Sequence, residues 1–477
     1  MSHRSAPRGQ GLIRPPAAAR VGPVVAGLLA LALYFWTAAP SIVWRDGGGD
    51  SGDLATAIAT GGVPHPPGYP LYVLLGRTLA AMTGIESARA GTIVAALAVS
   101  VSATLLVIAS RAAAAHNRSD PGSTHAWPAT AVALAIALGP LWWGRANHTT
   151  AHSLHLLFVA LALAVACGGV RATAVMRGLI LGLAASHHPT LLMIGALLLC
   201  PSARFAVGFA LGLFPITILP LQASVPWGWG DLTTVAGVFD HLTGRMYHGY
   251  LLAYGDAPLL DRLIRTLRTL LLDGIGLPLL ALLVVTGPSA GWLRSPLRLR
   301  VGLTAAAPPL LFLAYPARDT DAYLAPTVAC LALLALPGAS RLLGPGRGAF
   351  VRRTIVAASL LAWAAHSAVT NDRHADREAL DFAAATLAAA PPRAVLLTET
   401  DATTFALWYV QAEFGVRPDV VVVDRSLWAF GWYRARTAPA IPMPAAGASA
   451  IDDAGDIGAA SGRPTLAVSS DRAIPSR

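Results

Sequence analysis

The chain has 477 residues, of which 55% are hydrophobic and 13% are charged, and its formal net charge is +10. A soluble domain carries about a quarter charged residues. Half that share, together with a mean hydropathy of +0.57, indicates a polytopic membrane protein. All the cations are arginines in short clusters between apolar runs, which is typical of topology signals rather than of a nucleic-acid-binding face. The absence of lysine excludes P-loop and Schiff-base chemistry, since both need an amine.

The first predicted element is an apolar stretch from Val21 to Ala39, which follows four arginines in residues 1–20. We interpret it as a membrane span that starts in the cytoplasm. A cleaved signal peptide is the competing interpretation, because small residues end the stretch. Further apolar runs follow along the chain, at residues 90–110, 127–143, 154–170, 178–199, 203–221, 263–286, 300–315, 322–338 and 352–369.

One of these runs, residues 178–199, contains His187-His188-Pro189 near its middle. Proline breaks helices, and only a pair of short helices meeting here puts every later arginine cluster on the cytoplasmic side. The sequence therefore predicts about eleven membrane segments in the inner (plasma) membrane, with the N-terminus in the cytoplasm and the C-terminus outside. Residues 41–88 and 222–262 then form the two large outer segments.

Residues 371–440 have the pattern of a small α/β domain outside the membrane. An apolar run, a helical stretch over 403–414 and four valines from Val420 give a strand–helix–strand order. Residues 441–477 are rich in alanine, glycine, proline and aspartate, which predicts a disordered tail. The predicted fold class is mainly α, with a polytopic bundle over residues 21–370 that carries this small domain.

Two carboxylates, Asp50 and Asp53, stand three residues apart in the first outer segment, and His65 follows among prolines and glycines. One interpretation is a helix start, with Asp50 at the N-cap and Asp53 as the third helical residue of a capping box. The other is catalytic, with a carboxylate that acts as general base or orients an acceptor hydroxyl. The two are compatible, since acids at a helix start can still face a substrate.

Six stretches make the catalytic interpretation more specific. They read DSGDL, GVPHPPGYP, GLAASHHPTLL, PWGWGD, ARDTDAYLAP and YVQAEFGVRPDVVVV. In this order, over residues 24–433, they resemble the motifs of the O-mannosyltransferase-like polytopic membrane family of the glycosyltransferase C superfamily, in a bacterial form. The resemblance implies that a first-loop acid serves catalysis and that a sugar, with mannose as a candidate, is transferred from polyprenyl phosphate on the outer face of the membrane.

This resemblance implies two catalytic residues. Asp50 is expected to be the base or acceptor-orienting acid, and Asp53 to support it or join it at a metal. The expected substrate-binding residues come from the same motifs and from two outer arginines, whose guanidinium groups suit a phosphate. They are His65, Tyr69, His187, His188, Trp229, Asp231, Arg245, Arg318 and Asp321.

The implied partners are membrane lipid, the polyprenyl-phosphate sugar and an unknown protein, lipid or glycan acceptor, with no nucleic acid. No metal ligands are assigned, and a divalent metal stays open. The alternative function is a membrane transporter or lipid-handling protein, because helix breaks and buried polar groups also bind transported substrates. A catalytically inactive family member is the third hypothesis.

One position departs from the family pattern. Thr150 stands where the family has an acid, so either the acceptor differs or the activity is changed or lost. Around it, His148, His152 and His155 have spacings that predict one helical face. A metal site is one interpretation of this stripe. We favour a polar stripe that lines a wet cavity or contacts phosphate, since no cysteine or nearby acid completes a ligand set.

Overall fold

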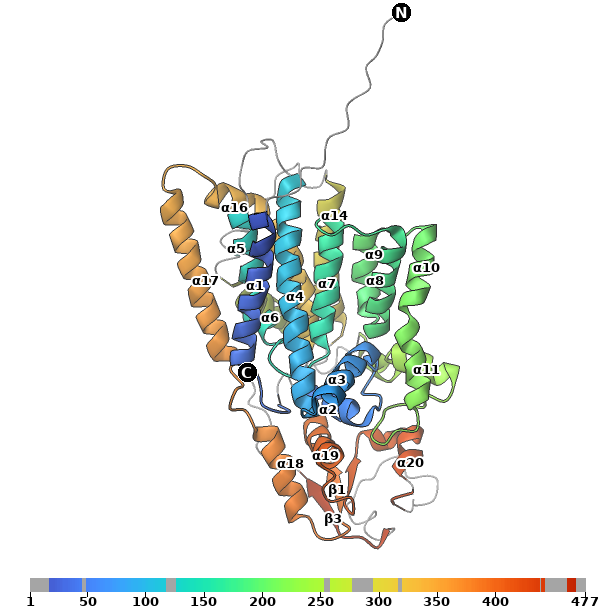
Figure 1. Ribbon diagram of the computed structural model, residues 1–477. Helices are drawn as coiled ribbons and strands as arrows, with labels where there is room; N and C mark the ends of the chain where they lie inside the picture. The colour runs from blue at the N-terminus through green and yellow to red at the C-terminus, as the bar shows by residue number, and fades with distance from the viewer. Residues whose placement is uncertain are drawn as a thin grey trace, which may run out of the picture.

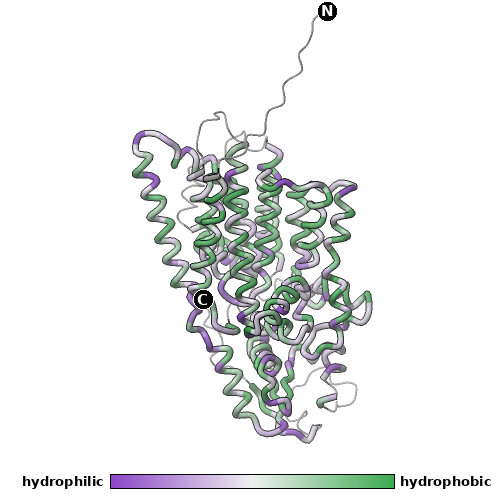
Figure 2. The backbone as a smooth tube through the Cα atoms, in the orientation of Figure 1, coloured by the Kyte–Doolittle hydropathy of each residue, from purple (hydrophilic) through white to green (hydrophobic). Residues whose placement is uncertain are grey.

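The computed structural model describes residues 17–44, 49–116, 126–252, 258–276, 295–315, 320–437, 439–441 and 461–468. Figure 1 shows two parts, a long bundle of helices and a small domain with the strands at one end of it. In Figure 2 the bundle helices are predominantly hydrophobic, as expected for a protein that lies in a membrane.

The bundle is built from helices of very different lengths. They are α1 (Ala17–Trp36), α4 (Ser87–His116), α5 (Ala126–Ala137), α6 (Pro140–Trp143), α7 (His152–Ala166), α8 (Ala174–His187), α9 (Thr190–Leu199), α10 (Ala203–Gly212), η1 (Phe214–Gln222), α12 (Leu259–Arg268), η3 (Thr269–Ile275), α14 (Pro296–Ala314), η4 (Thr320–Leu324), α15 (Ala325–Leu334), α16 (Leu336–Leu343) and α17 (Ala349–Asn371). Short helices at the end near the small domain are α2 (Asp50–Thr60), α3 (Pro70–Thr83), α11 (Val235–Leu242) and η2 (Arg245–Tyr250).

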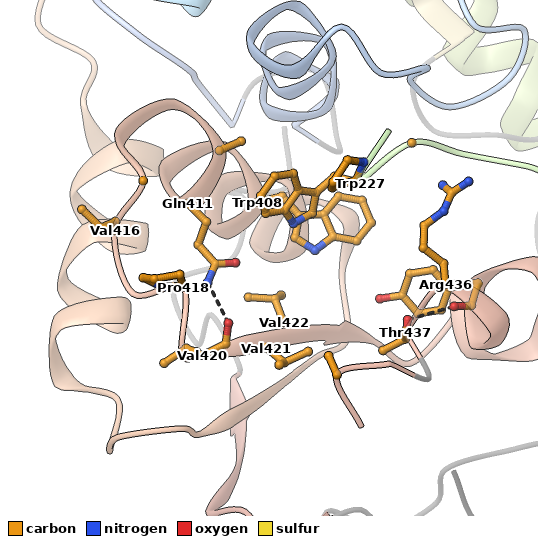
Figure 3. Close-up of a pocket in the computed structure, with 16 residues that line it drawn as sticks. Trp227, Trp408, Gln411, Val416, Pro418, Val420, Val421, Val422, Arg436 and Thr437 are labelled. Atoms are coloured by element: carbon orange, nitrogen blue, oxygen red, sulfur yellow. Dashed lines mark hydrogen bonds between the residues drawn. The ribbon is translucent and has the colours of Figure 1, made fainter. Parts of the chain in front are cut away.

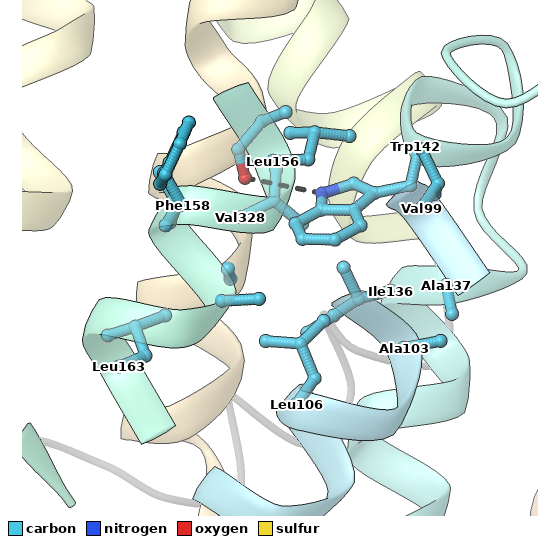
Figure 4. Close-up of a cluster of buried hydrophobic side chains, with 14 of the residues drawn as sticks. Val99, Ala103, Leu106, Ile136, Ala137, Trp142, Leu156, Phe158, Leu163 and Val328 are labelled. Atoms are coloured by element: carbon cyan, nitrogen blue, oxygen red, sulfur yellow. Dashed lines mark hydrogen bonds between the residues drawn. The ribbon is translucent and has the colours of Figure 1, made fainter. Parts of the chain in front are cut away.

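The core of the bundle is an apolar cluster from α4, α5, α6, α7 and α15. Figure 4 shows the indole of Trp142 at its centre, with Leu106, Ile136 and Val328 around it. The indole Nε1–H donates to the carbonyl oxygen of Ala325 at 3.3 Å, so the one polar group of this large side chain is satisfied inside the cluster.

Three helical stretches among the described residues are long and apolar enough to cross a membrane: Ser87–Ala115, Ala203–Gln222 and Pro296–Ala314. The pair Asp321–Leu334 and Leu336–Leu343, bent by 47° at its break, would make a fourth span. Several other apolar helices are shorter, and part of the predicted run 263–286 lies outside the described residues. The predicted count of eleven segments is therefore not confirmed.

The predicted break near His187-His188-Pro189 is present. Helix α8 ends at His187 and α9 begins at Thr190. At about 1.5 Å per residue, helices of 14 and 10 residues are too short to cross a hydrocarbon core of about 30 Å. Each has a buried face and an exposed apolar face, and α8 is held closely against α10 through facing glycines. Small residues let helix backbones approach in this way, as is common between membrane helices. The glycines are Gly178, Gly182, Gly208 and Gly212.

The two ends of the bundle differ in character. Figure 1 places α2, α3, α11 and the small domain at one end, and the starts of α8, α14 and α17 at the other. The arginine clusters of residues 171–177, 298–300 and 341–353 belong to these latter connections. This arrangement agrees with the prediction that the arginines share one side and the first-loop acids the other. The plasma membrane and the orientation of the termini stay predictions.

The small domain has the predicted strand–helix–strand order. Its elements are α18 (Glu378–Ala389), β1 (Val395–Thr398), α19 (Asp401–Phe414), β2 (Val421–Asp424), η5 (Leu427–Ala429), α20 (Gly431–Thr437) and β3 (Thr465–Val468). The three strands are parallel in the order β2-β1-β3. The prediction of a disordered tail is wrong for β3, because apolar side chains at Leu466 and Val468 let this short segment pair with β1. Residues 442–460 and 469–477 lie outside the described residues.

The domain is joined closely to the first outer segment. A Cβ atom on Gly52 of α2 would lie 2.8 Å from the backbone carbon and oxygen of Phe405, so only glycine lets α2 pack this closely on α19. The indole Nε1–H of Trp44 donates to the Ala402 carbonyl at 2.9 Å. Nearby, the Glu86 carboxylate accepts a hydrogen bond from the Tyr409 hydroxyl at 2.5 Å. Helix α2 therefore forms the interface between the helix bundle and the small domain.

Candidate active site

Asp53 is the most constrained of the predicted site residues. Its side chain is 1% exposed, and Oδ1 accepts from the Trp229 indole at 2.9 Å. Oδ2 lies 2.8 Å from the backbone nitrogen of His65, which donates to it, and 2.7 Å from His65 Nδ1. The Pro-rich loop after α2 folds back along the helix and places His65 beside Asp53 in the first turn of α2. Both carboxylate oxygens are used to fix His65 and Trp229.

Asp50 is placed differently. Gly49, in the left-handed conformation with φ of 80°, is the N-cap of α2, and Asp50 is its first helical residue. The predicted capping box is therefore wrong, since Asp50 is not at the N-cap and Asp53 bonds to His65 and Trp229. Asp50 Oδ2 lies 3.8 Å from His65 Nε2, and the Asp50 side chain is 36% exposed. Of the two acids, Asp50 is the one a substrate can reach.

Tyr69 and the two histidines of the helix break are brought to the same place. Tyr69 is 3% exposed, and its ring lies 5.4 Å from His65, 5.4 Å from His187 and 6.0 Å from His188. His187 Nε2 lies 3.0 Å from the carbonyl oxygen of Ala151. The tip of the broken helix pair therefore lies beside Tyr69 of the first outer segment.

The histidines near Thr150 do not form one helical face. Helix α7 begins at His152, so His148 lies before it and the predicted stripe is wrong at that residue. His152 and His155 instead flank Tyr323, with ring distances of 5.2 and 5.8 Å. Neither ring nitrogen of the buried His155 has a hydrogen-bond partner among the described residues. A buried polar group of this kind is expected to meet water or a ligand.

Tyr323 connects this cluster to the helix break. Its hydroxyl lies 2.8 Å from Nε2 of His188, whose Nδ1 is 2.7 Å from the hydroxyl of Thr190. The motif ARDTDAYLAP contains Tyr323, but Arg318 and Asp321 are the residues of this motif that the sequence predicted to bind substrate. Asp321 lies two residues earlier in η4.

The small domain adds an acid that the sequence did not indicate. Asp401 opens α19, and the preceding Thr400 caps that helix. Desolvation, together with the nearby carboxylates of Asp424 and Asp50, raises the pKa of Asp401 to about 7. Burial also raises the pKa of Tyr247 well above its ordinary value, with Asp401, Asp50 and Asp53 contributing. No local motif marks Asp401, because only the packing of α19 on α2 brings it to the site.

Several predicted site residues have other surroundings. Asp231 Oδ1 accepts from the Thr233 hydroxyl at 2.6 Å within its own turn. Arg245 is 70% exposed and forms an ion pair with Asp240 at 3.1 Å. No contact of Asp231 or Arg245 with the acids of α2 is present in the described part of the chain. Arg318 lies outside the described residues.

Thr150 is buried near the end of the loop before α7, and its backbone nitrogen donates to the Tyr72 hydroxyl at 3.0 Å. No group of three or more histidine, cysteine, aspartate or glutamate side chains arranged for a metal ion is found among the residues that the structure describes. The two residues assigned to catalysis and most of the aromatic and histidine residues assigned to substrate thus gather at α2, around a site built from carboxylates, imidazoles and phenols.

Two family models match parts of the chain. Residues 50–204 match the protein O-mannosyl-transferase TMEM260 N-terminal domain, and residues 379–442 match TMEM260-associated domain 2. The two matched segments contain α2 and α19, the helices that meet at the acids. These matches confirm the predicted resemblance to the O-mannosyltransferase-like membrane family.

A particular relative is the protein O-mannosyl-transferase TMEM260 of Mus musculus, 26% identical over 445 residues. The match covers 83% of this chain and 62% of the mouse protein, so the chain spans less than two thirds of that relative. The crystal structure of ArnT from Cupriavidus metallidurans bound to undecaprenyl phosphate has a TM-score of 0.49 at 12% identity, covering 87% of this chain and 92% of that one. Its apo structure has a TM-score of 0.46 at 15% identity, covering 90% and 96%.

Proposed function

We propose that the protein is a membrane glycosyltransferase that moves a sugar, with mannose as the first candidate, from a polyprenyl-phosphate donor to a hydroxyl acceptor on the outer face of the plasma membrane. Family membership supports the class of reaction. The observation that carries the proposal is the difference in exposure between the two acids: Asp53 is 1% exposed, whereas Asp50 is 36% exposed and lies 3.8 Å from Nε2 of the same histidine.

In this proposal Asp50 is the general base. The acceptor oxygen attacks the anomeric carbon, the bond from that carbon to the phosphate oxygen breaks, and the acceptor proton passes to the Asp50 carboxylate. The reaction needs a base within hydrogen-bond reach of the acceptor, and an exposed carboxylate meets that need. Asp53 acts through His65, whose ring it holds by Nδ1 so that Nε2 faces Asp50.

The donor phosphate is assigned to the histidine side of the site. His187 and His188 lie at the helix break, and Tyr323 and His155 continue the polar surface into the bundle. N–H and O–H groups fixed in a mostly apolar interior stabilise charge that develops on a leaving phosphate without having to reorganise. The apolar bundle behind them is suited to the polyprenyl chain.

The test is transfer by the purified full-length protein. Radiolabelled polyprenyl-phosphate mannose, glucose and arabinose are offered with protein, lipid and glycan acceptors, and Asp50→Asn serves as the negative control. Transfer of one sugar by the wild type and its loss in Asp50→Asn is the expected result. Donor binding without transfer to any acceptor or to water would instead make the chain an inactive family member. Movement of a substrate across the membrane of reconstituted vesicles, without sugar transfer, would favour the alternative function as a transporter.

A further inference from the structure

A cavity of about 520 Å³ lies in the small domain, away from the acids, between α19, β2, α20 and the segment 226–228. Its size is in the range of ligand-binding pockets. Figure 3 shows Trp227 and Trp408 on one side of it and the β2 backbone opposite. The wall is mostly apolar, and its polar members are few: Gln411, Arg436 and Thr437.

The floor of the cavity is an edge of the described sheet. In the sheet order β2-β1-β3, β2 has a neighbour on one side only among the described strands. The backbone nitrogens of Val421 and Arg425 donate to Ala394 and Thr398, at 3.0 and 3.1 Å, on the β1 side. Because a strand alternates, the N–H and C=O groups of Val422 point to the opposite edge, where the cavity lies.

The positions on either side of Val422 are already capped by side chains. Gln411 Nε2 donates to the Val420 carbonyl at 2.9 Å, as Figure 3 shows, and the Asp424 nitrogen donates to the Tyr433 hydroxyl at 2.9 Å. No hydrogen bond to the outward N–H or C=O of Val422 is found within the described residues. The cavity therefore exposes one donor and one acceptor of the main chain between aromatic walls.

The upper wall is strained and is tied to the acids. Trp227 has a φ of 59°, which is an outlier for a bulky side chain and is typical of functional segments. Two residues later Trp229 faces the other way and donates to Asp53. Arg436 Nη2 donates to the carbonyls of Ala223 and Gly230, at 3.0 and 3.4 Å, and so holds both ends of this segment. One short loop thus lines the cavity with the indole of Trp227 and contacts Asp53 with the indole of Trp229.

We propose that this cavity docks an extended segment of a polypeptide acceptor. The segment pairs with the Val422 main chain, as peptides do at other exposed strand edges, and places an apolar or aromatic side chain among Trp227, Trp408 and Tyr433. A sugar or lipid acceptor has no repeating amide to match the free donor and acceptor of β2. That the docked peptide is the acceptor of the sugar rests on the proposed function. That the cavity binds an extended peptide does not depend on it.

The experiment measures binding and transfer separately. A fluorescein-labelled peptide, acetyl-Thr-Phe-Thr-Val-Thr-amide, is titrated into the purified full-length protein and followed by anisotropy. The same peptide N-methylated at its central amide loses the main-chain donor without any change to the protein. We expect binding of the parent peptide, and binding weakened about tenfold or more by N-methylation, by Trp227→Ala and by Val422→Pro.

Matched controls keep the test decisive. Phe414→Ala removes an exposed aromatic ring of α19, the helix of Trp408, at a position outside the cavity. Trp227→Phe keeps an aromatic ring in the wall of the cavity. Both variants should bind the peptide nearly as the wild type does. Transfer to the peptide should show a raised KM in Trp227→Ala, because the aromatic wall of the docking site is lost. Absence of binding to the wild type, equal binding of the N-methylated peptide, or displacement of the peptide by mannobiose would overturn the docking proposal. Binding without transfer would overturn only the proposed function.

Discussion

The bundle and the small domain contact opposite sides of α2 and offer it opposite chemistry. From the bundle come neutral donors and aromatic rings, among them His187, His188 and Tyr323. From the domain comes the carboxylate of Asp401, at the start of α19. In the proposed reaction one kind of surface would serve the leaving phosphate and the other the incoming hydroxyl. The comparison therefore predicts that activity needs both parts of the molecule.

The largest expected effect is at Asp50, the more exposed of the two acids of α2. Asp50→Asn keeps the size of the side chain and removes its charge, so sugar transfer should fall by about 10²-fold or more, the scale of losing a general base. The unfolding midpoint should hardly move, because Gly49 and not Asp50 is the N-cap. The charge-matched control is Asp381→Asn, an exposed acid of α18 that should transfer normally. Full activity in Asp50→Asn would refute the base assignment.

Asp53→Asn should affect folding as well as activity. Each carboxylate oxygen accepts from an N–H group, so whichever way the new amide turns, its NH₂ faces a donor on Trp229 or on the His65 backbone. An unsatisfied buried pair of this kind costs about 1–3 kcal/mol. Chemical denaturation of Asp53→Asn and Asp50→Asn, each compared with the wild type, measures the free energy of unfolding. If Asp53→Asn were as stable as the wild type, the role of Asp53 in holding the loop would be wrong.

Gly52→Ala tests the seam between the two regions. The added Cβ would meet the Phe405 backbone at 2.8 Å and push α2 from α19, at a cost of about 1–3 kcal/mol. Transfer should fall with it, since Asp50 is carried by α2. Gly249→Ala is the control, because a Cβ there has nothing within 4 Å. Equal stability of the two variants would show that the seam is loose.

Deleting residues 461–477 should lower the stability of the domain by about 1–2 kcal/mol, a typical range for the loss of a packed element. It removes β3 and leaves β1 with one neighbour. Deleting 469–477 alone is the control and should leave the sheet intact. Limited proteolysis of the domain, followed by mass spectrometry, separates the two results, and identical cleavage rates would count against a structural role for β3.

The smallest effect is a change of pH dependence at Asp401. A pKa near 7 in the folded protein, against about 3.9 in the unfolded chain, means that the folded state binds this proton more tightly. Stability should therefore decline as pH rises from about 4 to 7, and Asp401→Asn should flatten that decline. Thermal unfolding at pH 5 and pH 8 measures it, with Asp381→Asn as the control. A slope unchanged in Asp401→Asn would remove Asp401 from the charged cluster.

The sequence predicted features that have local causes. Proline and two histidines marked the break between α8 and α9, alternating apolar runs marked β1-α19-β2, and the first outer segment held Asp50, Asp53 and His65 within sixteen residues of one another. Family resemblance, not spacing, assigned those residues their roles.

Features that depend on long-range packing were missed. Asp401 and Tyr323 reach the site only because α19 and η4 fold back on the first third of the chain. β3 is flanked by a composition that predicts disorder, and its pairing with β1 is visible only in three dimensions. The predicted count of eleven segments is not confirmed, because several apolar runs form helices of 10–17 residues, which composition alone does not distinguish from full spans.

The hydrogen bond from Trp44 to Ala402 joins residues 358 positions apart, and it has a consequence for how the protein is made. At roughly 5–20 residues per second, a ribosome that has just released the first-loop acids needs roughly 20–70 s more to deliver the helix that walls them in. During that interval the nascent chain is already inserted, with its acids and no completed centre. The site that includes α19 is therefore completed only after most of the bundle has been synthesised.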